Sequence, residues 1–508
     1  MTEQPATPAL GNEEDRSDDP VRWRILIVLL TAIFMSLVGV SIVNVALPSI
    51  QDGLGASQSD LQWVLSGYAL TFGVVLVAAG RAGDLFGRGG IFILGVLLFT
   101  ASSIAAGLAP NAEALNGARF LQGVGSGMLN PQGVGMIQQY FRGAERGRAF
   151  GFFGSTVGVA VGIGPVIGGL LIKLGGPDFG WRLTFLVNVP IGLLTLGLAL
   201  WWFPRPLLRR IPAEPGGKVG GVRRTLRALD PVGSILITVA VLAILWPFVE
   251  ADAGPAVWTL IPVGLGLIGV WVWWERRYAR RGGSPMVDLK IFRTSSFTNG
   301  SIIVSLYFLG MTSIWVIVAL FLQQGLGHSA LVAGLVGLPA ALISSFAADW
   351  AGRNVMRLGR KVVIGGLLFA LTGLGLAIAV VLLRGTGTLS EWWLIPALVF
   401  IGIAQGSVIS PNQTLTLADV PLAYAGSSGA VMQTGQRIGT SIGIAVITAA
   451  VFGVLGSTSW FTAAALGFGL VAVVVALALA VAIKDQRDRR RIAAVVDDAE
   501  PATAPVAD

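Results

Sequence analysis

The chain has 508 residues, of which 54% are apolar and only 12% are charged, about half the charged share of a soluble globular protein. It contains no cysteine and one histidine, His328, which excludes a disulfide framework, a thiolate nucleophile and a histidine metal cluster. The net charge of +8 is spread over short segments between apolar runs rather than gathered on one face. We therefore expect no nucleic-acid partner, no cofactor and no metal.

The apolar residues form fourteen runs, most of them about 20 residues long. Runs of this length cross the hydrocarbon layer as helices, and they are continuous rather than alternating, which favours helices over a barrel. The predicted fold is therefore an all-α polytopic membrane protein. The runs lie at 25–47, 61–80, 90–109, 113–139, 150–172, 183–203, 231–249, 257–274, 298–322, 331–348, 362–383, 393–417, 429–454 and 461–483.

Polar and basic segments divide these runs into six, two and six. Paired six-helix halves are typical of secondary transporters, whose substrate site lies at the bilayer midplane between the halves. The predicted segments are a disordered cytoplasmic tail (1–21), an N-terminal six-helix half (22–203), a basic cytoplasmic linker (204–230), two extra helices (231–274), a second basic loop (275–296), a C-terminal six-helix half (297–483) and a cytoplasmic tail (484–508).

The orientation follows from the distribution of basic residues. With the N-terminus inside, 30 of the 35 Lys and Arg residues fall in cytoplasmic segments, while the outer loops are short and acidic. This is the positive-inside pattern of bacterial-type membrane proteins. We expect both termini in the cytoplasm and a multi-pass protein in the cell membrane.

The first inner loop reads GRAGDLFGRGG and lies between the second and third runs. Its glycines allow a sharp turn close to another helix. Asp84 suits a helix N-terminus or a cation, and such a contact can break and re-form as two halves rock. The alternative is a charged loop that only sets orientation. The candidate gating residues are Gly80, Asp84, Gly87 and Arg88.

Arg119 lies several residues inside the fourth run. A central Arg costs about 2.5–3.5 kcal/mol on insertion scales, so we expect it to be buried against polar partners or a wet cavity. The alternative is a structural Arg that binds backbone carbonyls of a neighbouring span.

The fifth run is rich in glycine. Gly154, Gly158 and Gly162 recur every four residues and give a smooth face for close helix packing. The step Gly164–Pro165 and the pair Gly168–Gly169 predict a kink or hinge as well.

Together these stretches resemble the loop, span-four and span-five motifs of the major facilitator superfamily, in the same order, and the span-five pattern is similar to that of its exporters. SIVNVALPSI (41–50), PNQTLTLADVP (411–421) and GQRIGTSIGIA (435–445) resemble spans one, twelve and thirteen of its fourteen-span drug:proton antiporters. The resemblance covers residues 22–484. It implies a secondary efflux transporter of small amphipathic compounds such as drugs or metabolites, working by alternating access in exchange for protons.

The resemblance also implies roles for single residues. Gly80, Asp84 and Arg88 would form a cytoplasmic gate, and Arg119, Gln122 and Gly123 a span-four motif linked to proton coupling. The antiporter hinge would comprise Gly158, Gly162, Gly164, Pro165, Gly168 and Gly169. Asn44 and Pro48 would line or shape the end of span one.

Two positions depart from the family pattern. Many relatives carry an Asp five residues before Asn44, where this chain has Gly39, and the second copy of the loop motif has Met356 where an Asp is common. By the predicted boundaries no Asp or Glu lies deep in a span, although proton coupling usually needs a buried carboxylate with a raised pKa. The nearest acids are Asp84, Asp349, Asp419 and Glu113, with a purely interfacial role as the alternative.

Polar side chains within the runs are the candidates for facing a substrate. Arg119 and Arg437 are the only deep charges, and both are positive, which favours neutral or anionic amphipathic substrates over quaternary cations. The candidate substrate-facing residues are Asn44, Asn130, Gln132, Gln405, Asn412, Gln433, Gln436 and Arg437.

Three other functions remain as alternatives. A facilitator, or a lipid or metabolite exporter without proton coupling, would have the same fold. A membrane-embedded enzyme would need intramembrane His or acid clusters, which the sequence does not offer. A sensor would need a soluble domain, and the tails are short and polar. We expect a monomer that interacts with the lipid bilayer, its substrate and protons.

Overall fold

The computed structural model describes residues 20–208, 230–249, 254–283 and 285–499. Every regular element in these ranges is helical. The long helices are α1 (Val21–Leu54), α2 (Gln58–Phe86), α3 (Arg88–Gly107), α4 (Ala112–Tyr140), α5 (Gly143–Leu186), α6 (Asn188–Trp202), α8 (Pro231–Val249), α9 (Leu260–Arg280), α10 (Ser295–Leu320), α11 (Ala330–Leu358), α12 (Arg360–Gly385), α13 (Leu394–Thr416), α14 (Ala425–Leu455) and α15 (Trp460–Ala499).

The predicted polytopic helical fold is confirmed. Thirteen helices in the described ranges are long and apolar enough to cross a membrane. The remaining predicted span, 113–139, corresponds to α4, whose mean hydropathy is too low for that group. Helix α4 packs against α2, α3 and α14, and most of its polar side chains are buried between these neighbours. A helix shielded from lipid by its neighbours tolerates polar residues that a lipid-facing helix does not.

Some boundaries differ from the predicted ones. The fifth and sixth predicted spans meet at a break in α5 at Gly176, where φ is 70°, and α6 begins at Asn188 rather than at 183. Helix α15 continues to Ala499, well beyond the predicted end at 483. Of the predicted tails and linker, residues 1–19, 209–229 and 500–508 lie outside the described residues.

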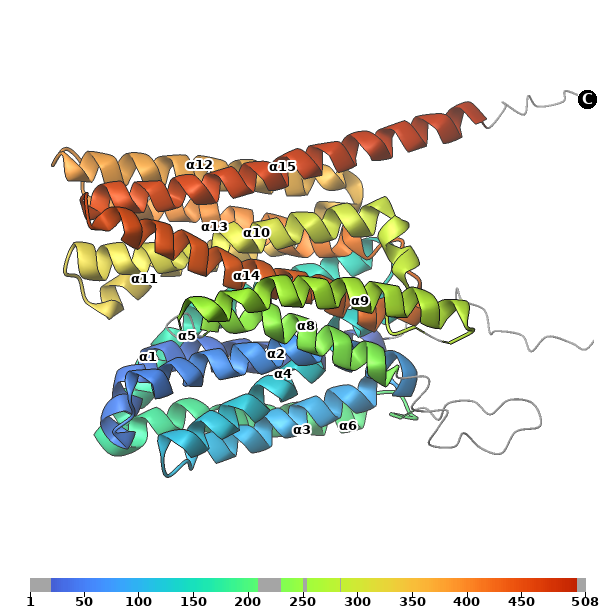
Figure 1. Cartoon of the computed structure of the whole chain (residues 1–508), viewed down its shortest axis with the longest axis horizontal. Helices are drawn as coiled ribbons and strands as arrows, with labels where there is room; N and C mark the ends of the chain where they lie inside the picture. Colours follow the sequence, from blue (N-terminus) through green and yellow to red (C-terminus); the bar gives the residue numbers. More distant parts are fainter. Residues whose placement is uncertain (1–19, 209–229, 250–253, 284, 500–508) are drawn as a thin grey trace, which may run out of the picture.

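The helices form two groups that lie side by side, with the extra pair along their boundary (Figure 1). The first half consists of α1 to α6 and the second half of α10 to α15. Between them, α5 packs on α11, and α2 packs on α14. Helix α8 contacts α9, α2 and α14, so the extra pair touches both halves.

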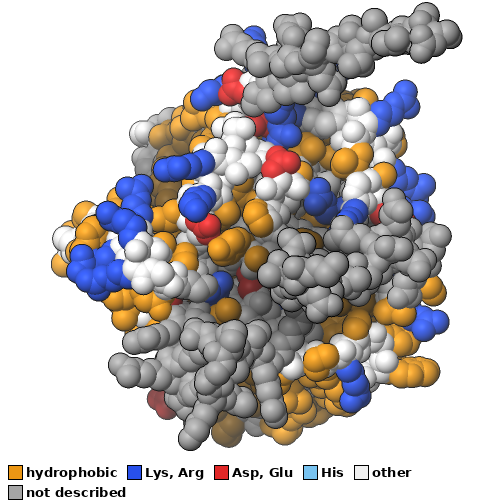
Figure 2. All heavy atoms as spheres, turned by 90° about the vertical axis from the view of Figure 1, so that its right-hand side faces the viewer, with side chains coloured by type: hydrophobic (Ala, Val, Ile, Leu, Met, Phe, Trp, Pro, Cys, Tyr) orange, Lys and Arg blue, Asp and Glu red, His pale blue; other side chains and the backbone are white. Residues whose placement is uncertain are grey.

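One end of the bundle is basic, and we call it the basic end. It is formed by the turns after α2, α4 and α11 and by the C-terminal end of α9. Many Lys and Arg side chains gather on this face, with hydrophobic side chains around its rim (Figure 2). The positive-inside rule predicts that such an end lies in the cytoplasm.

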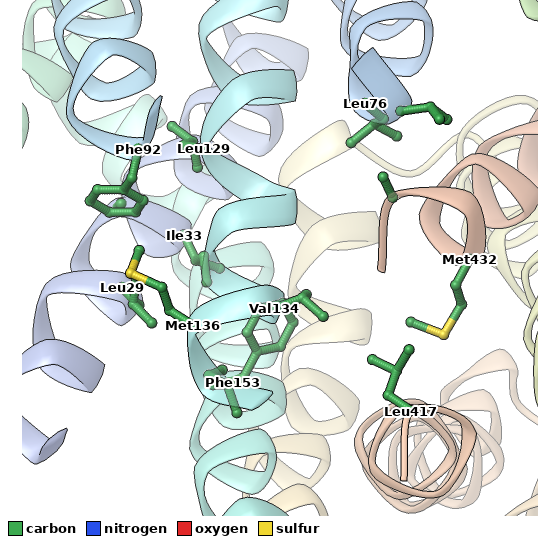
Figure 3. Packing of buried hydrophobic residues seen from close by; sticks show 14 of the residues in the cluster. Leu29, Ile33, Leu76, Phe92, Leu129, Val134, Met136, Phe153, Leu417 and Met432 are labelled. Carbon is green, nitrogen blue, oxygen red and sulfur yellow. The ribbon is translucent and has the colours of Figure 1, made fainter. Parts of the chain in front are cut away.

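The hydrophobic core of the first half extends across the boundary between the halves. Leu129 and Met136 of α4 lie close to Leu29 and Ile33 of α1 (Figure 3), whereas Val134 faces Gly429 of α14. The same cluster includes residues of the second half, among them Leu417 and Met432. The two halves are therefore packed against each other through apolar side chains as well as through the polar contacts described next.

Candidate functional site

Asp84 joins the first half to the second at the basic end. It lies in the last turn of α2, and its side chain is only 1% exposed. Its two oxygens accept hydrogen bonds from the backbone N–H groups of Gly426 and Ser427, each 2.9 Å long. These are the first residues of α14, where backbone donors and the helix dipole favour a negative charge. The carboxylate therefore caps a helix of the opposite half.

Arg88 reinforces this contact from the start of α3. Its guanidinium lies 2.8 Å from Asp84 Oδ1 and donates a 2.7 Å hydrogen bond to the carbonyl oxygen of Leu422, just before α14. It also donates to Gln139 Oε1 at 2.8 Å, which ties α3 to α4. A buried Arg with acceptors on both halves holds them together only in this relative position.

The two glycines of the same motif permit the close approach. A Cβ on Gly80 would lie 2.7 Å from the carbonyl oxygen of Gly426 and 2.9 Å from Ala430 Cβ, so only glycine lets α2 reach α14 here. Gly87 turns the chain between α2 and α3 with φ 105°, a conformation that other residues rarely adopt. Gly80, Asp84 and Arg88 thus meet the second half in one contact, and Gly87 makes the turn that places Arg88 there.

A second contact between the halves runs along the glycine face of α5. A Cβ on Gly158 would lie 2.7 Å from Ser345 Oγ, and one on Gly162 would lie 2.8 Å from Ala341 Cβ, both on α11. Ser155 Oγ donates to the Ser345 carbonyl at 2.6 Å, and Ser345 Oγ donates back to the Ser155 carbonyl at 3.1 Å. The face therefore forms a tight seam between α5 and α11.

The later part of the glycine motif packs within the first half. A Cβ on Gly164 would overlap Ser41 Oγ of α1, and one on Gly168 would lie 2.8 Å from Ile42 Cγ1. Gly169 faces open space. The backbone stays helical through Gly164 and Pro165, and its break lies at Gly176 instead. The residues predicted as one hinge are thus divided between two packing faces.

Arg119 is 1% exposed and makes the contacts of a structural arginine. Its Nε donates to the Val64 carbonyl of α2 at 2.8 Å, and a terminal nitrogen donates to Gln122 Oε1 at 2.6 Å. Gln122 in turn donates to Ser103 Oγ of α3 at 2.7 Å, while Gly123 allows α4 to approach the backbone of Tyr68. No carboxylate of the described residues forms an ion pair with Arg119, so these contacts favour the structural alternative.

Arg437 is the second deep arginine, and it faces the first half from α14. Its guanidinium carbon lies 4.3 Å from the ring centre of Phe72 on α2, within the range of a cation–π contact. Arg119 lies 4.4 Å from the neighbouring Tyr68 ring in the same way, and the two rings are stacked 6.2 Å apart. Within the described residues, Arg437 has no ion pair or hydrogen bond, which leaves its charge available to an anionic group.

The other candidate substrate-facing residues differ in whether their polar groups are already hydrogen-bonded within the protein. Gln132 donates to the Ala79 carbonyl at 2.7 Å, and Asn412 binds both Arg360 and the Gly300 carbonyl, so these two amides serve helix packing. Asn130 donates to the Ser126 carbonyl on its own helix. The residues without a hydrogen bond to any described residue are Asn44, Gln405, Gln433 and Gln436.

Three acids that were not among the candidates are buried at or just beyond the ends of the apolar runs. Asp230 and Glu275 are each 1% exposed and Asp485 is fully buried. The predicted boundaries put all three in loops or tails. Asp230 directly precedes α8, and α9 and α15 extend past their predicted ends to include Glu275 and Asp485. Asp485 forms a 2.6 Å ion pair with Arg360 at the start of α12. The sequence signal was each acid's position directly beside a long apolar run.

Of the four acids named from the sequence, only Asp84 is buried. Asp349 pairs with Arg353 on the surface at 2.8 Å, and Asp419 and Glu113 are exposed. Gly39, which replaces the Asp of many relatives, is close-packed: a Cβ there would lie 3.2 Å from Phe99 Cζ and 3.4 Å from Asn188 Nδ2.

Comparison with known proteins agrees with this geometry. The family model described as Major Facilitator Superfamily matches residues 29–444. The probable actinorhodin transporter of Streptomyces coelicolor is 34% identical over 86% of this chain and 73% of its own. The puromycin resistance protein of Streptomyces alboniger is 33% identical over 84% of this chain and 82% of its own. The human organic anion transporter MFSD10 shares the fold, with a TM-score of 0.61 at 13% identity over 91% of this chain and 100% of its own.

Proposed function

Because the chain belongs to the Major Facilitator Superfamily, we propose that this multi-pass protein of the bacterial cytoplasmic membrane exports small amphipathic compounds by alternating access. Two of its relatives are described as a probable actinorhodin transporter and a puromycin resistance protein, which supports antibiotics or related metabolites as substrates. We propose further that it acts as a monomer and not as an enzyme, and that the basic end and both termini lie in the cytoplasm.

The observation that carries this proposal is the capping of α14 by Asp84. Alternating access needs contacts between the halves that can break as a unit when the halves rock about a central site. The bonds from Gly426 and Ser427 to Asp84 cross the boundary between the halves, as does the bond from Arg88 to Leu422. These contacts close the basic end, and their loss would open it.

The substrate preference follows from the groups that lack partners. Arg437 beside Phe72 offers a positive charge and an aromatic face, and Gln433 and Gln436 lie within a turn of it on α14. A site of this kind favours neutral or anionic amphipathic compounds over quaternary cations.

The proposed energy source is exchange for protons. A potential of about 100 mV contributes about 2.3 kcal/mol per charge moved, which sustains a substantial export gradient for each proton admitted. The test is a pH jump applied to proteoliposomes loaded with an accepted substrate. Antiport predicts substrate-dependent proton flux, whereas a facilitator or an uncoupled exporter of lipids or metabolites would show transport without it.

The substrate class is tested by growth of deletion and overexpression strains against a panel of toxic anionic, neutral and cationic compounds. We expect overexpression to raise tolerance to anionic and neutral amphiphiles. Efflux of quaternary cations alone would contradict the assignment of Arg437 as a substrate-facing charge.

A further inference from the structure

The two extra helices bury a pair of carboxyl groups at the basic end. Asp230 directly precedes α8, and Glu275 lies near the C-terminal end of α9. Each is 1% exposed. Neither residue belongs to the contact between the halves or to the residues that face a substrate, and the function proposed above gives them no role.

One oxygen of each carboxyl group is occupied by donors. Asp230 Oδ1 accepts from the Gly233 backbone N–H at 3.0 Å and from Trp274 Nε1 at 2.9 Å. Glu275 Oε2 accepts from the Met286 backbone N–H at 3.1 Å. These bonds fix both side chains in place and join α8, α9 and the segment after α9.

The remaining two oxygens are buried and have no hydrogen-bond partner: Asp230 Oδ2 and Glu275 Oε1. Both point into the same space beside Gly233. A Cβ on Gly233 would clash with Asp230 Oδ2 and would lie 2.9 Å from Glu275 Oε1. The two unpartnered oxygens therefore border the same small buried space.

Two carboxylates that share a buried site do not both ionise, and a buried oxygen without a donor is costly. One proton lessens both costs, because it removes one of the two negative charges and gives one of the two oxygens a hydrogen to donate. We propose that Asp230 and Glu275 share one proton and form a proton-binding site built by the two extra helices. On release, the proton passes to water and leaves two negative charges.

Arg81 of α2 connects this site to the contact between the halves. It interacts electrostatically with Asp230 and Glu275, and also with Asp84 and Tyr424. A proton lost from the pair adds a negative charge that competes with Asp84 for the positive charge of Arg81. This weakens the electrostatic support of Asp84 while it is buried in the closed contact, whereas water screens Asp84 once the contact opens. Loss of the proton therefore favours opening of the basic end, and by linkage the open state binds the proton more weakly.

The first experiment detects the proton itself, without substrate. Infrared spectra of the purified full chain at neutral pH should contain a C=O band of a protonated carboxyl group that shifts in heavy water. Glu275→Gln and Asp230→Asn should each remove it. Both amides keep the acceptor oxygen and supply a donor in place of the shared proton, so both variants should fold. The exposed control Glu113→Gln should retain the band. Absence of the band from the wild-type protein, or its survival in both amide variants, would overturn the proposal.

The second experiment measures the link to the contact between the halves. The chain has no cysteine, so Ala144→Cys and Met356→Cys place two unique spin labels at exposed positions at the basic ends of α5 and α11. Raising the pH should increase the population with a long distance between the labels, and Glu275→Gln should hold the population at its low-pH value. An unchanged pH response in Glu275→Gln would refute the link. Neither experiment contains substrate, so both results are independent of the proposed antiport. A failure of antiport in the transport assay can therefore be told apart from a failure of this inference.

Discussion

Replacing Asp84 by Asn tests whether the capping of α14 controls the closed state. The amide keeps one acceptor oxygen for Gly426 and Arg88, but it loses the charge and places an N–H donor against the Ser427 N–H. Hydrogen bonds to a charged group contribute about 1.5–3 kcal/mol each, so we expect the closed state to lose about 3 kcal/mol relative to the open state. That change shifts the ratio of the two states about a hundredfold.

The spin labels at positions 144 and 356 measure the shift directly, and transport in proteoliposomes measures its consequence. We expect Asp84→Asn to populate mainly the long distance and to export at least about tenfold more slowly. Asp60→Asn is the matched control, because Asp60 caps the other end of the same helix through Ser57, a contact within the first half. A wild-type distance distribution in Asp84→Asn would refute the reasoning, whatever the transport rate.

Three further substitutions test the other contacts. Gly158→Val should force α5 and α11 apart and lower export at least about tenfold without preventing folding. The control Gly169→Val lies at a glycine that faces open space and should export normally. Equal export rates in the two variants would contradict a functional role for the close packing of α5 on α11. Arg437→Ala should weaken export of anionic compounds about tenfold more than that of neutral ones, and equal losses in paired uptake assays would exclude a substrate-facing charge. Arg119→Ala should destabilise the folded protein by about 2–4 kcal/mol, because it removes hydrogen-bond donors from a buried network. The measurement is the Tm in detergent, which should fall. An unchanged Tm with lost proton coupling would favour a coupling role instead.

The amino-acid sequence by itself determined the helical membrane fold. A run of about 20 apolar residues spans the bilayer as a helix, because a helix satisfies every backbone hydrogen bond within its own segment. Even α4, whose mean hydropathy is too low for the group of thirteen, was among the fourteen apolar runs predicted from the sequence. The loop motif at Asp84 and Arg88 was also recognisable, because its glycines and charges are consecutive in the chain.

Only the tertiary structure decided what these residues touch. The partner of Asp84 is the start of α14, more than 300 residues away, and the glycines of α5 separate into a face toward α11 and a face toward α1. The burial of Asp230 and Glu275 depends on where α8 and α9 end and on how they pack together. Hydropathy describes each segment alone, whereas burial and pairing are properties of neighbouring helices. The most informative charges of this protein were therefore visible in its sequence, but their environment was not.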